Sequence, residues 1–275
     1  VDGASYMPGV RSRAEESILA ELHQLAAAGY REVVLSAISL PSYGLDTGTN
    51  LVELVEKCAQ VDGIERIRLG SLDPDMLHDE VITRMAAVKK LCPQFHLSLQ
   101  SGCDKTLRAM RRPYTTAQFA DIAAKLRAAF GAENVSFTTD VIVGFPGETE
   151  EDFVKTLELV RKVGYMQLFT FIYSKRNGTP AAKLPDPTTH AEKAARMDRL
   201  LKTQEEFAFA ATAAMAGRTV RVLVEAAGRN EGTVNGRLDN NLVVEFKAPE
   251  SLIGQWADVH ITGSRAALLV GELAE

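Results

Sequence analysis

One stretch, TTDVIVGFPGETEEDF at residues 138–153, constrains the fold of this chain more than any other. It contains a short apolar run, VIV, of the kind that fills a strand buried on both faces, and the run breaks at Gly144, Pro146 and Gly147. A helix is predicted to follow, because Thr149 and Asp152 have the spacing of a capping box. A strand, a glycine-rich turn and a helix N-terminus place free backbone N–H groups at the carboxyl edge of a sheet, where α/β folds bind ligands. We therefore expect the active site at this edge.

The composition is that of a globular protein with room for one large and one small domain, with 275 residues of which 46% are hydrophobic. No run approaches the roughly 20 apolar residues of a membrane helix, and no charged-then-apolar leader precedes the first predicted helix. We therefore expect a cytoplasmic protein with no membrane partner. The net charge of −5 means that any contact with RNA must be local. The spacing of the three cysteines and five histidines fits no metal motif, so we predict no metal ligands among them.

Helices and strands are predicted to alternate through the first part of the chain. Ser12 with Glu15, and Thr115 with Gln118, have the spacing of capping boxes at helix starts. The alternation predicts a parallel α/β architecture. An irregular fragment, VDGASYMPGVRSR, stands where a further first strand is expected, and this strand would bring the total to six, as in an open, TIM-like partial (β/α)6 barrel. The five strands that the pattern itself predicts are 32–38, 64–69, 95–99, 135–143 and 166–173.

The pattern changes after the last of these strands. Residues 177–187 have the Gly, Pro and Lys content of a linker, and a long helix is predicted from about residue 189 to 215, before Gly217. Five short strands separated by Gly and Asn turns follow, which predicts a small, five-stranded OB-like β-barrel. Such barrels bind single-stranded RNA or only pack and stabilise. We therefore expect two domains, residues 1–214 and 215–275.

Three segments of the first part resemble one known family. FHLSLQSGCDKTLRAMRRPYT, TTDVIVGFPGETEEDF and FTFIYSKRNGTPAAKLP closely resemble the methylthiotransferase branch of the radical S-adenosylmethionine (SAM) enzymes, which act on tRNA or on a ribosomal protein. The C-terminal GRLDNNLVVEF, LIGQWADVHIT and LLVGEL resemble the TRAM domain of that family, an RNA-binding β-barrel. The resemblance implies a six-stranded partial barrel with a 4Fe–4S cluster on a CxxxCxxC loop, SAM bound to the open iron of that cluster, and a second cluster in a separate N-terminal domain.

The chain departs from this family at the cluster ligands. No CxxxCxxC motif occurs in the 275 residues. Residues 1–3 resemble the end of the family's first strand, and residues 5–13 resemble the end of its cluster loop. We therefore hypothesise that the sequence joins the two sides of a cluster loop whose cysteines have been left out, which predicts an interrupted backbone between Val1 and Arg11. The alternatives are a deliberate truncation and a cluster-less relative that only binds RNA.

The candidate cofactor-binding residues lie at the predicted carboxyl ends of strands, where parallel barrels bind ligands. Ser36 and Ser39 end the first of the predicted strands, a region that in the family contacts the methionine part of SAM. Ser98 and Gln100 end the strand at 95–99. The Gln100 amide needs hydrogen-bond partners, which either ribose hydroxyls or its own loop would supply.

The two following strands supply further candidates for this site. Asp140 precedes an apolar core, so its carboxylate must be paired or face a ligand. Gly144 would let the backbone approach the adenosine of SAM. Glu148 either belongs to the same site or caps the next helix, where its charge favours the helix dipole. Phe171 and Tyr173 end the last strand, and they either stack on adenine or belong to the core. His96 and Cys103, near the same edge, are interpreted as structural.

The candidate RNA-binding residues form two groups. Near the carboxyl edge, a set of basic residues would contact phosphates: Arg108, Arg111, Arg112, Lys175 and Arg176. The C-terminal domain contains six basic and eight acidic side chains, so strong nonspecific RNA binding by this domain alone is not expected. Any recognition there would use loop residues such as Arg237, Asn240 and Asn241.

The resemblance implies an enzyme that adds a methylthio group to C2 of a hypermodified adenosine beside the tRNA anticodon. The run LCPQFHLSLQSGCD most resembles the branch acting on N6-threonylcarbamoyladenosine, and other segments resemble the branch acting on N6-isopentenyladenosine. The implied partners are a tRNA anticodon stem-loop and an electron donor for the cluster. A cluster-less RNA-binding module is the alternative from a different functional class.

Overall fold

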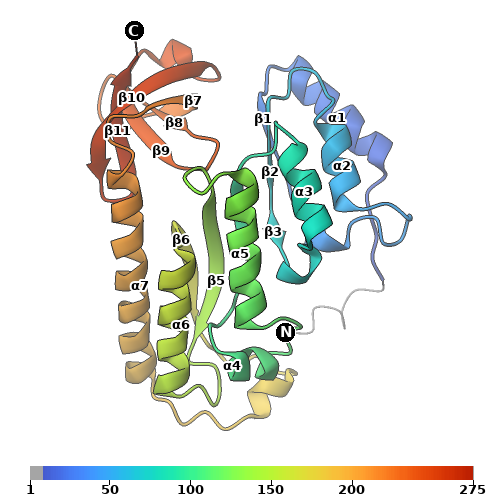
Figure 1. Ribbon diagram of the computed structural model, residues 1–275, viewed down its shortest axis with the longest axis vertical. Coiled ribbons are helices and arrows are strands. Elements are labelled where there is room, and N and C mark those ends of the chain that lie inside the picture. The colour runs from blue at the N-terminus through green and yellow to red at the C-terminus, as the bar shows by residue number, and fades with distance from the viewer. Residues whose placement is uncertain (1–8, 275) are drawn as a thin grey trace.

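An open parallel sheet forms the larger part of the computed structural model, which describes residues 9–274 (Figure 1). Strand β1 pairs with β2, and β3, β4, β5 and β6 pair in that order, all in parallel. A bridge between Ile67 and Leu91 joins the two sheets, so the strands follow one another in sequence order. The strands are β1 (Glu32–Leu35), β2 (Arg66–Leu69), β3 (Ser71–Leu72), β4 (Gln94–Leu97), β5 (Ser136–Val143) and β6 (Gln167–Ile172).

Helices cover the outer face of this sheet, and the strands bury alternate side chains beneath them (Figure 1). Phe95 and Leu97 on β4, like Phe137 on β5, are buried in the main apolar core. His96 and Asp140 belong to the opposite, inner face, because successive side chains of a strand point to opposite faces. The helices of this part are α1 (Glu15–Ala27), α2 (Leu51–Cys58), α3 (Asp79–Ala87), α4 (Asp104–Ala109), α5 (Thr116–Phe130) and α6 (Glu150–Val163). Short 3-10 turns lie at Leu40–Ser42, Pro74–Met76, Pro180–Lys183 and Glu250–Leu252.

Local capping signals set the starts of two of these helices as predicted. Thr115 caps α5 and Thr149 caps α6, each in a complete capping box with the residue three positions later. The box predicted for Ser12 and Glu15 is wrong, because the N-cap of α1 is Ala14 and has no side-chain cap. The Ser12 hydroxyl instead donates to Asp46 at 2.5 Å and accepts from the N–H of Gly44 at 2.8 Å.

A long helix leads from the sheet to a separate β-barrel. Helix α7 (His190–Ala213) begins with a third capping box, between Thr189 and Glu192, and runs from the lower end of the molecule to the barrel in Figure 1. The barrel is closed in the order β10, β11, β9, β8, β7 and has its own apolar core, which includes Val222, Val244 and Ile261. Its strands are β7 (Thr219–Ala227), β8 (Thr233–Arg237), β9 (Val243–Lys247), β10 (Trp256–Arg265) and β11 (Leu268–Leu273).

Two buried arginines of β2 attach this barrel to the sheet. Arg68 donates from its guanidinium to the carbonyl oxygens of Leu238 and Asp239, both at 2.6 Å, and Arg66 donates to the carbonyl of Arg237 at 2.9 Å. The Glu32 carboxylate forms ion pairs with both arginines, at 2.6 Å from Nε of Arg66 and 2.7 Å from Nε of Arg68. Since β2 begins at Arg66, the barrel covers the amino ends of the strands and leaves their carboxyl ends free.

The predicted fold class is confirmed, since the chain combines a parallel α/β sheet with helices on its outer face and a closed five-stranded barrel. The predicted sixth strand and most of the predicted cluster loop fall on residues 1–8, outside the described residues. The interrupted backbone predicted between Val1 and Arg11 therefore stays a prediction. The expectation of a linker at 177–187 is wrong in part, because a 3-10 turn, Pro180–Lys183, forms there and packs near the carboxyl edge.

Candidate active site

A pocket of about 360 Å³ lies at the carboxyl edge of the sheet. Gln100 after β4, Asp140 and Ile142 on β5, and Phe171 on β6 line it. Its lining combines one carboxylate, one amide and three arginines with aromatic and aliphatic groups. A few polar groups among apolar ones are typical of small-molecule sites. The other lining residues include Met110, Arg111, Arg112, Phe145, Tyr173, Arg176 and Pro180.

The backbone of Gln100 is held in an uncommon conformation at the mouth of β4. Its φ is 69°, in the left-handed region that few residues other than Gly adopt. Two hydrogen bonds to β5 fix it there, because its N–H donates to the carbonyl of Asp140 at 2.8 Å and its carbonyl accepts from the N–H of Ile142 at 2.9 Å. Backbone strain of this kind clusters at ligand-binding sites. The same two bonds set the Gln100 and Asp140 side chains beside one pocket.

The carboxylate of Asp140 has a partner on the inner face of the sheet. Its Oδ2 lies 3.4 Å from Nε2 of His96, and Nδ1 of the same ring lies 3.0 Å from the hydroxyl of Thr138. The His96 ring packs against Phe169, with the ring centroids 5.5 Å apart. His96 is thus a satisfied histidine, as predicted, and it also fixes the position of Asp140, a contact that the sequence did not indicate.

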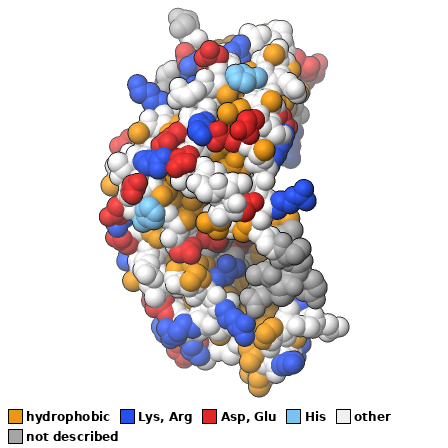
Figure 2. All heavy atoms as spheres, turned by 90° about the vertical axis from the view of Figure 1, so that its right-hand side faces the viewer, with side chains coloured by type: hydrophobic (Ala, Val, Ile, Leu, Met, Phe, Trp, Pro, Cys, Tyr) orange, Lys and Arg blue, Asp and Glu red, His pale blue; other side chains and the backbone are white. Residues whose placement is uncertain are grey.

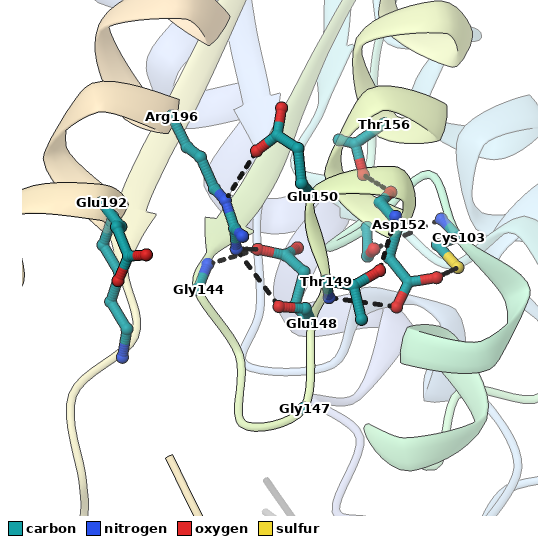
Figure 3. Close-up of polar contacts among 12 residues, drawn as sticks. Cys103, Gly144, Gly147, Glu148, Thr149, Glu150, Asp152, Thr156, Glu192 and Arg196 are labelled. Carbon is teal, nitrogen blue, oxygen red and sulfur yellow. Dashed lines mark hydrogen bonds and ion pairs between the residues drawn. The ribbon is translucent and has the colours of Figure 1, made fainter. Parts of the chain in front are cut away.

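The buried side chain of Glu148 holds the turn after β5 in place (Figure 3). Its Oε2 accepts the N–H of Gly144 at 2.7 Å and lies 3.2 Å from Nη1 of Arg196 on α7. Burial raises the pKa of Glu148, although the Gly144 hydrogen bond and Arg196 oppose this shift. Glu148 therefore anchors the turn to α7 in addition to lying beside the start of α6.

The structure corrects the reason predicted for Gly144. Its φ of 73° does favour a residue without a side chain. However, a Cβ at Gly144 would lie 2.5 Å from the Cγ and Cδ atoms of Lys193, so the space above it is filled by α7 and not by a ligand. Lys193 is itself buried and pairs with Asp186 at 2.7 Å.

A second polar cluster joins the start of α6 to the start of α4 (Figure 3). Asp152 accepts from Nζ of Lys105 at 2.7 Å, from the N–H of Thr149 at 3.2 Å and from Sγ of Cys103 at 3.2 Å. Burial alone would raise the pKa of Asp152, but these hydrogen bonds lower it to about 2. The buried Cys103 is therefore a donor to a structural carboxylate, in agreement with its predicted passive role.

The structure brings together only some of the candidate cofactor-binding residues. Gln100, Asp140, Phe171 and Tyr173 line the same pocket. Ser98 is buried outside this lining, and its carbonyl accepts from the Tyr114 hydroxyl at 2.5 Å. Two further candidates, Ser36 and Ser39, are exposed and line a different cavity beside α1 and residues 10–13.

The candidate RNA-binding residues are also divided. Arg112 and Arg176 line the carboxyl-edge pocket. Arg108 lies on the outer surface between α4 and α6. Lys175 is exposed and directly precedes Arg176 in the chain. Figure 2 shows basic side chains at the lower end of the molecule, with acidic and basic side chains interspersed above them.

In the turn between β8 and β9, the predicted RNA contact of Asn240 does not fit its burial, and Arg237 and Asn241 are partly exposed. Asn240 is buried against the sheet: its carbonyl accepts from Ser136 at 2.5 Å, and its Oδ1 accepts from the N–H of Leu242. Arg237 pairs with Glu225 at 2.8 Å and also donates to Asn241. This turn joins the barrel to the sheet.

Sequence reasoning missed several residues of the pocket. Phe145 and Met110 were not singled out, although Phe145 lies inside the glycine-rich turn that the sequence did mark. Pro180 was assigned to a linker, and its position after the last strand is the signal that would have placed it near the carboxyl edge.

The chain is an open, parallel α/β barrel, and a polar and aromatic pocket lies at the carboxyl edge of its sheet. These two features place it in the class of barrel enzymes that bind ligands at the carboxyl ends of their strands. More narrowly, the chain belongs to the radical SAM superfamily, whose family model matches residues 3–160, more than half of the chain. The TRAM domain model matches residues 213–274.

Close relatives confirm the resemblance to the tRNA methylthiotransferases. The chain is 41% identical to the tRNA-2-methylthio-N(6)-dimethylallyladenosine synthase of Thermoanaerobacter sp. (strain X514), over 96% of this chain and 56% of the relative. It is also 41% identical to the protein of the same name from Carboxydothermus hydrogenoformans, over 96% of this chain and 60% of that relative. The chain thus spans little more than half the length of these relatives.

Solved structures show the same fold at low identity. Coproporphyrinogen III oxidase from Escherichia coli, a radical SAM enzyme, superposes with a TM-score of 0.51 at 16% identity, covering 70% of this chain and 46% of that one. A radical SAM methyltransferase from Kitasatospora setae gives a TM-score of 0.50 at 15% identity, covering 62% and 33% of the two chains.

Membership of this superfamily implies a 4Fe–4S cluster and SAM as cofactors. Residues 9–274 do not fit the cluster, because no group of three Cys, His, Asp or Glu side chains among them could hold a metal ion. Cys58, Cys92 and Cys103 are buried, and the first of these belongs to the main apolar core, as predicted. The residues of the carboxyl-edge pocket do fit SAM, since they offer a carboxylate, aromatic rings and the buried Tyr173 hydroxyl, which has no hydrogen-bond partner among the described residues.

Proposed function

We propose that the protein to which this chain belongs adds a methylthio group to C2 of N6-dimethylallyladenosine (isopentenyladenosine) in tRNA. The observation that carries the proposal is the 41% identity to synthases of that name over 96% of the chain, combined with the pocket at the carboxyl edge. The TRAM domain match supports an RNA substrate. None of the helices in residues 9–274 is long and apolar enough to cross a membrane, and a cytoplasmic location stays a prediction.

The pocket residues supply recognition and exclude water. SAM supplies the methyl group and a reactive adenosyl group when it is bound. The Asp140 carboxylate, fixed by His96, would accept hydrogen bonds from ribose hydroxyls, and the Gln100 amide would both donate and accept. Phe171, whose side chain is half exposed at the edge strand, would stack on a purine ring. Burial of the reacting groups in this pocket would keep water from them.

The comparisons favour a different modified adenosine from the one that the sequence favoured. The sequence favoured N6-threonylcarbamoyladenosine, but the relatives are named for the dimethylallyl compound, so the alternative is the better supported of the two. The two groups differ sharply in chemistry, because a threonylcarbamoyl group carries a carboxylate and a dimethylallyl group is a hydrocarbon. Met110, Ile142 and Phe145 provide the pocket with an apolar surface that suits the hydrocarbon.

The other parts of the proposal concern domains and partners. We place the boundary between the radical SAM core and the TRAM barrel at residues 214 and 215, directly after α7. The tRNA anticodon stem-loop is the proposed macromolecular substrate. Arg112 and Arg176 at the pocket would contact its phosphates. An electron donor is the proposed redox partner.

The proposal is tested with the full-length protein, reconstituted with iron and sulfide without oxygen. It is supplied with SAM, a reductant and one of two anticodon stem-loops that differ only in the N6 group. Mass spectrometry of the nucleosides should show the methylthio product from the dimethylallyl RNA and little from the threonylcarbamoyl RNA. The reverse preference would restore the original expectation. RNA binding without SAM turnover by protein that has full iron content would support the cluster-less RNA-binding module.

A further inference from the structure

A groove separates the barrel from the amino edge of the sheet, on the side opposite the carboxyl-edge pocket. It consists of two adjoining cavities of about 320 and 630 Å³ that share Glu133, Met215, Arg218 and Asn240 in their linings. We call this feature the interdomain groove. One wall comes from the loops before β4 and β5 and from the ends of α5 and α6, and the other wall comes from the end of α7 and the barrel.

Basic side chains without carboxylate partners gather in the interdomain groove. Within residues 9–274, none of these six cations forms an ion pair: Lys89, Lys90, Arg127, Arg161, Lys162 and Arg218. The lining carboxylates are fewer and mostly engaged. Glu65 lies 3.1 Å from Arg31 and 3.6 Å from Arg221, and Asp239 accepts the N–H of Asn240. Glu133 is the remaining carboxylate of the lining.

This excess of positive charge is local. The whole chain carries a net charge of −5, and many arginines and lysines elsewhere in the fold, such as Arg84 and Lys57, pair with a carboxylate. Unpaired cations that line one concave surface raise the local concentration of anions there. The groove lining includes exposed cations from both parts, Lys89 from the α/β part and Arg218 from the barrel side.

The groove is too far from the carboxyl-edge pocket to contact a nucleotide bound there. Strand β5 separates the two edges, and its eight residues span about 26 Å at ~3.3 Å per residue. An anion in the groove is therefore a different part of the substrate from the reacting base, or a different molecule. The stem of a folded RNA extends over such a distance and presents a phosphate at every nucleotide.

We infer that the interdomain groove binds the phosphate backbone of the RNA substrate at a distance from the modified nucleotide. The inference rests on the proposed function, because it takes RNA to be the substrate. In this arrangement the barrel contributes to binding mainly through the groove that it forms with the sheet, and less through the turn at Arg237–Asn241, which is occupied by the attachment to the sheet.

The test uses the full-length protein and measures its binding to the dimethylallyl stem-loop over a series of salt concentrations. The groove variant Lys89→Gln/Arg218→Gln removes two exposed, unpaired cations, one on each side. The control Lys202→Gln/Lys247→Gln also removes two exposed cations that form no ion pair within residues 9–274. One comes from α7 and one from β9, and both lie outside the groove linings. A charge-preserving variant, Lys89→Arg/Arg218→Lys, tests for rescue. SAM binding by equilibrium dialysis checks that the other edge is intact.

We expect the groove variant to bind RNA several-fold more weakly, with a slope of log affinity against log salt that is shallower by about 1.5, since each lost phosphate contact removes ~0.7 to 0.9. The control and charge-preserving variants should bind as the unmodified protein does. Unchanged RNA binding by the groove variant, or equally weakened RNA binding by the control, would contradict the inference that the groove binds RNA. Neither result would affect the proposed reaction. Failure of the unmodified protein to bind RNA would overturn both.

Discussion

The carboxylate of Glu148 and the guanidinium of Arg196 form an ion pair inside the protein, 3.2 Å apart, with side chains only 1% and 10% exposed. The pair joins the turn after β5 to α7, the helix that leads to the barrel. A buried pair of this kind costs desolvation energy, so its loss leaves one charge without compensation.

Replacement of Arg196 by Met should lower the free energy of unfolding by about 3 kcal/mol at pH 7, because the Glu148 carboxylate stays buried without its partner. Burial already raises the pKa of Glu148 above 4.5, and removal of Arg196 raises it further. A raised folded-state pKa means that the folded protein binds the proton more tightly than the unfolded chain, so the contribution of Glu148 to stability falls as pH rises.

Urea denaturation at pH 5 and pH 7 measures this effect, and the deficit of Arg196→Met should be smaller at pH 5. The matched control is Arg199→Met, whose arginine pairs with the half-exposed Glu150 and should change stability by no more than about 0.5 kcal/mol. Equal losses for the two variants would show that burial of the Glu148 pair has no special weight.

The pKa of Asp152 predicts a pH dependence of the opposite sign. Burial would raise this pKa, but hydrogen bonds from Lys105, the Thr149 N–H and Cys103 bring it down to about 2, from 3.8. The unfolded chain therefore binds the proton more tightly, and about 2 kcal/mol of stability that is present above pH 4 should disappear as pH falls toward 2.

In Asp152→Asn this part of the pH dependence should be absent, so the stability gap to the unmodified chain should narrow between pH 5 and pH 3. Asp121→Asn serves as the control, since Asp121 is an exposed partner of Lys125. A gap that stays constant over this range would mean that the Asp152 carboxyl has the same pKa in the folded and unfolded protein, which would contradict the lowered pKa.

Two glycines of one turn should respond differently to alanine. Gly144 has φ of 73° and a Cβ position 2.5 Å from Lys193, whereas Gly147 has φ of 84° and open space around it. Both substitutions introduce backbone strain of ~1 kcal/mol, but Gly144→Ala must also displace the buried Lys193 side chain. Thermal denaturation should therefore show a clearly larger loss for Gly144→Ala. Equal losses of stability for the two variants would mean that glycine is favoured at both positions by its backbone conformation alone.

Local signals in the sequence were sufficient for most of the fold. The capping boxes at Thr115 and Thr149 depend on contacts three residues apart, so their sequence spacing predicted them correctly. Ser12 had the same spacing to Glu15, yet its hydroxyl bonds to Asp46, 34 residues away, and no local pattern announces such a partner.

The site could be predicted only in part for the same reason. The ends of β4, β5 and β6 follow from the alternation of strands and helices, and this placed Gln100, Asp140, Phe171 and Tyr173 near one edge. The role of Gly144 depends on Lys193, 49 positions later in the chain, and the burial of Asn240 depends on how the barrel docks. Long-range packing of this kind leaves no trace in residue spacing.

The most direct test of the account compares SAM binding by three single variants of the full-length protein, measured by equilibrium dialysis. Asp140→Asn and Phe171→Ala alter the carboxyl-edge pocket, and Ser39→Ala alters the separate cavity beside α1. The account predicts that the first two lose about tenfold or more in affinity, as expected for loss of a hydrogen bond to a charged group or of a stacked ring, and that Ser39→Ala binds normally. Normal binding by Asp140→Asn and Phe171→Ala, with loss in Ser39→Ala, would contradict it.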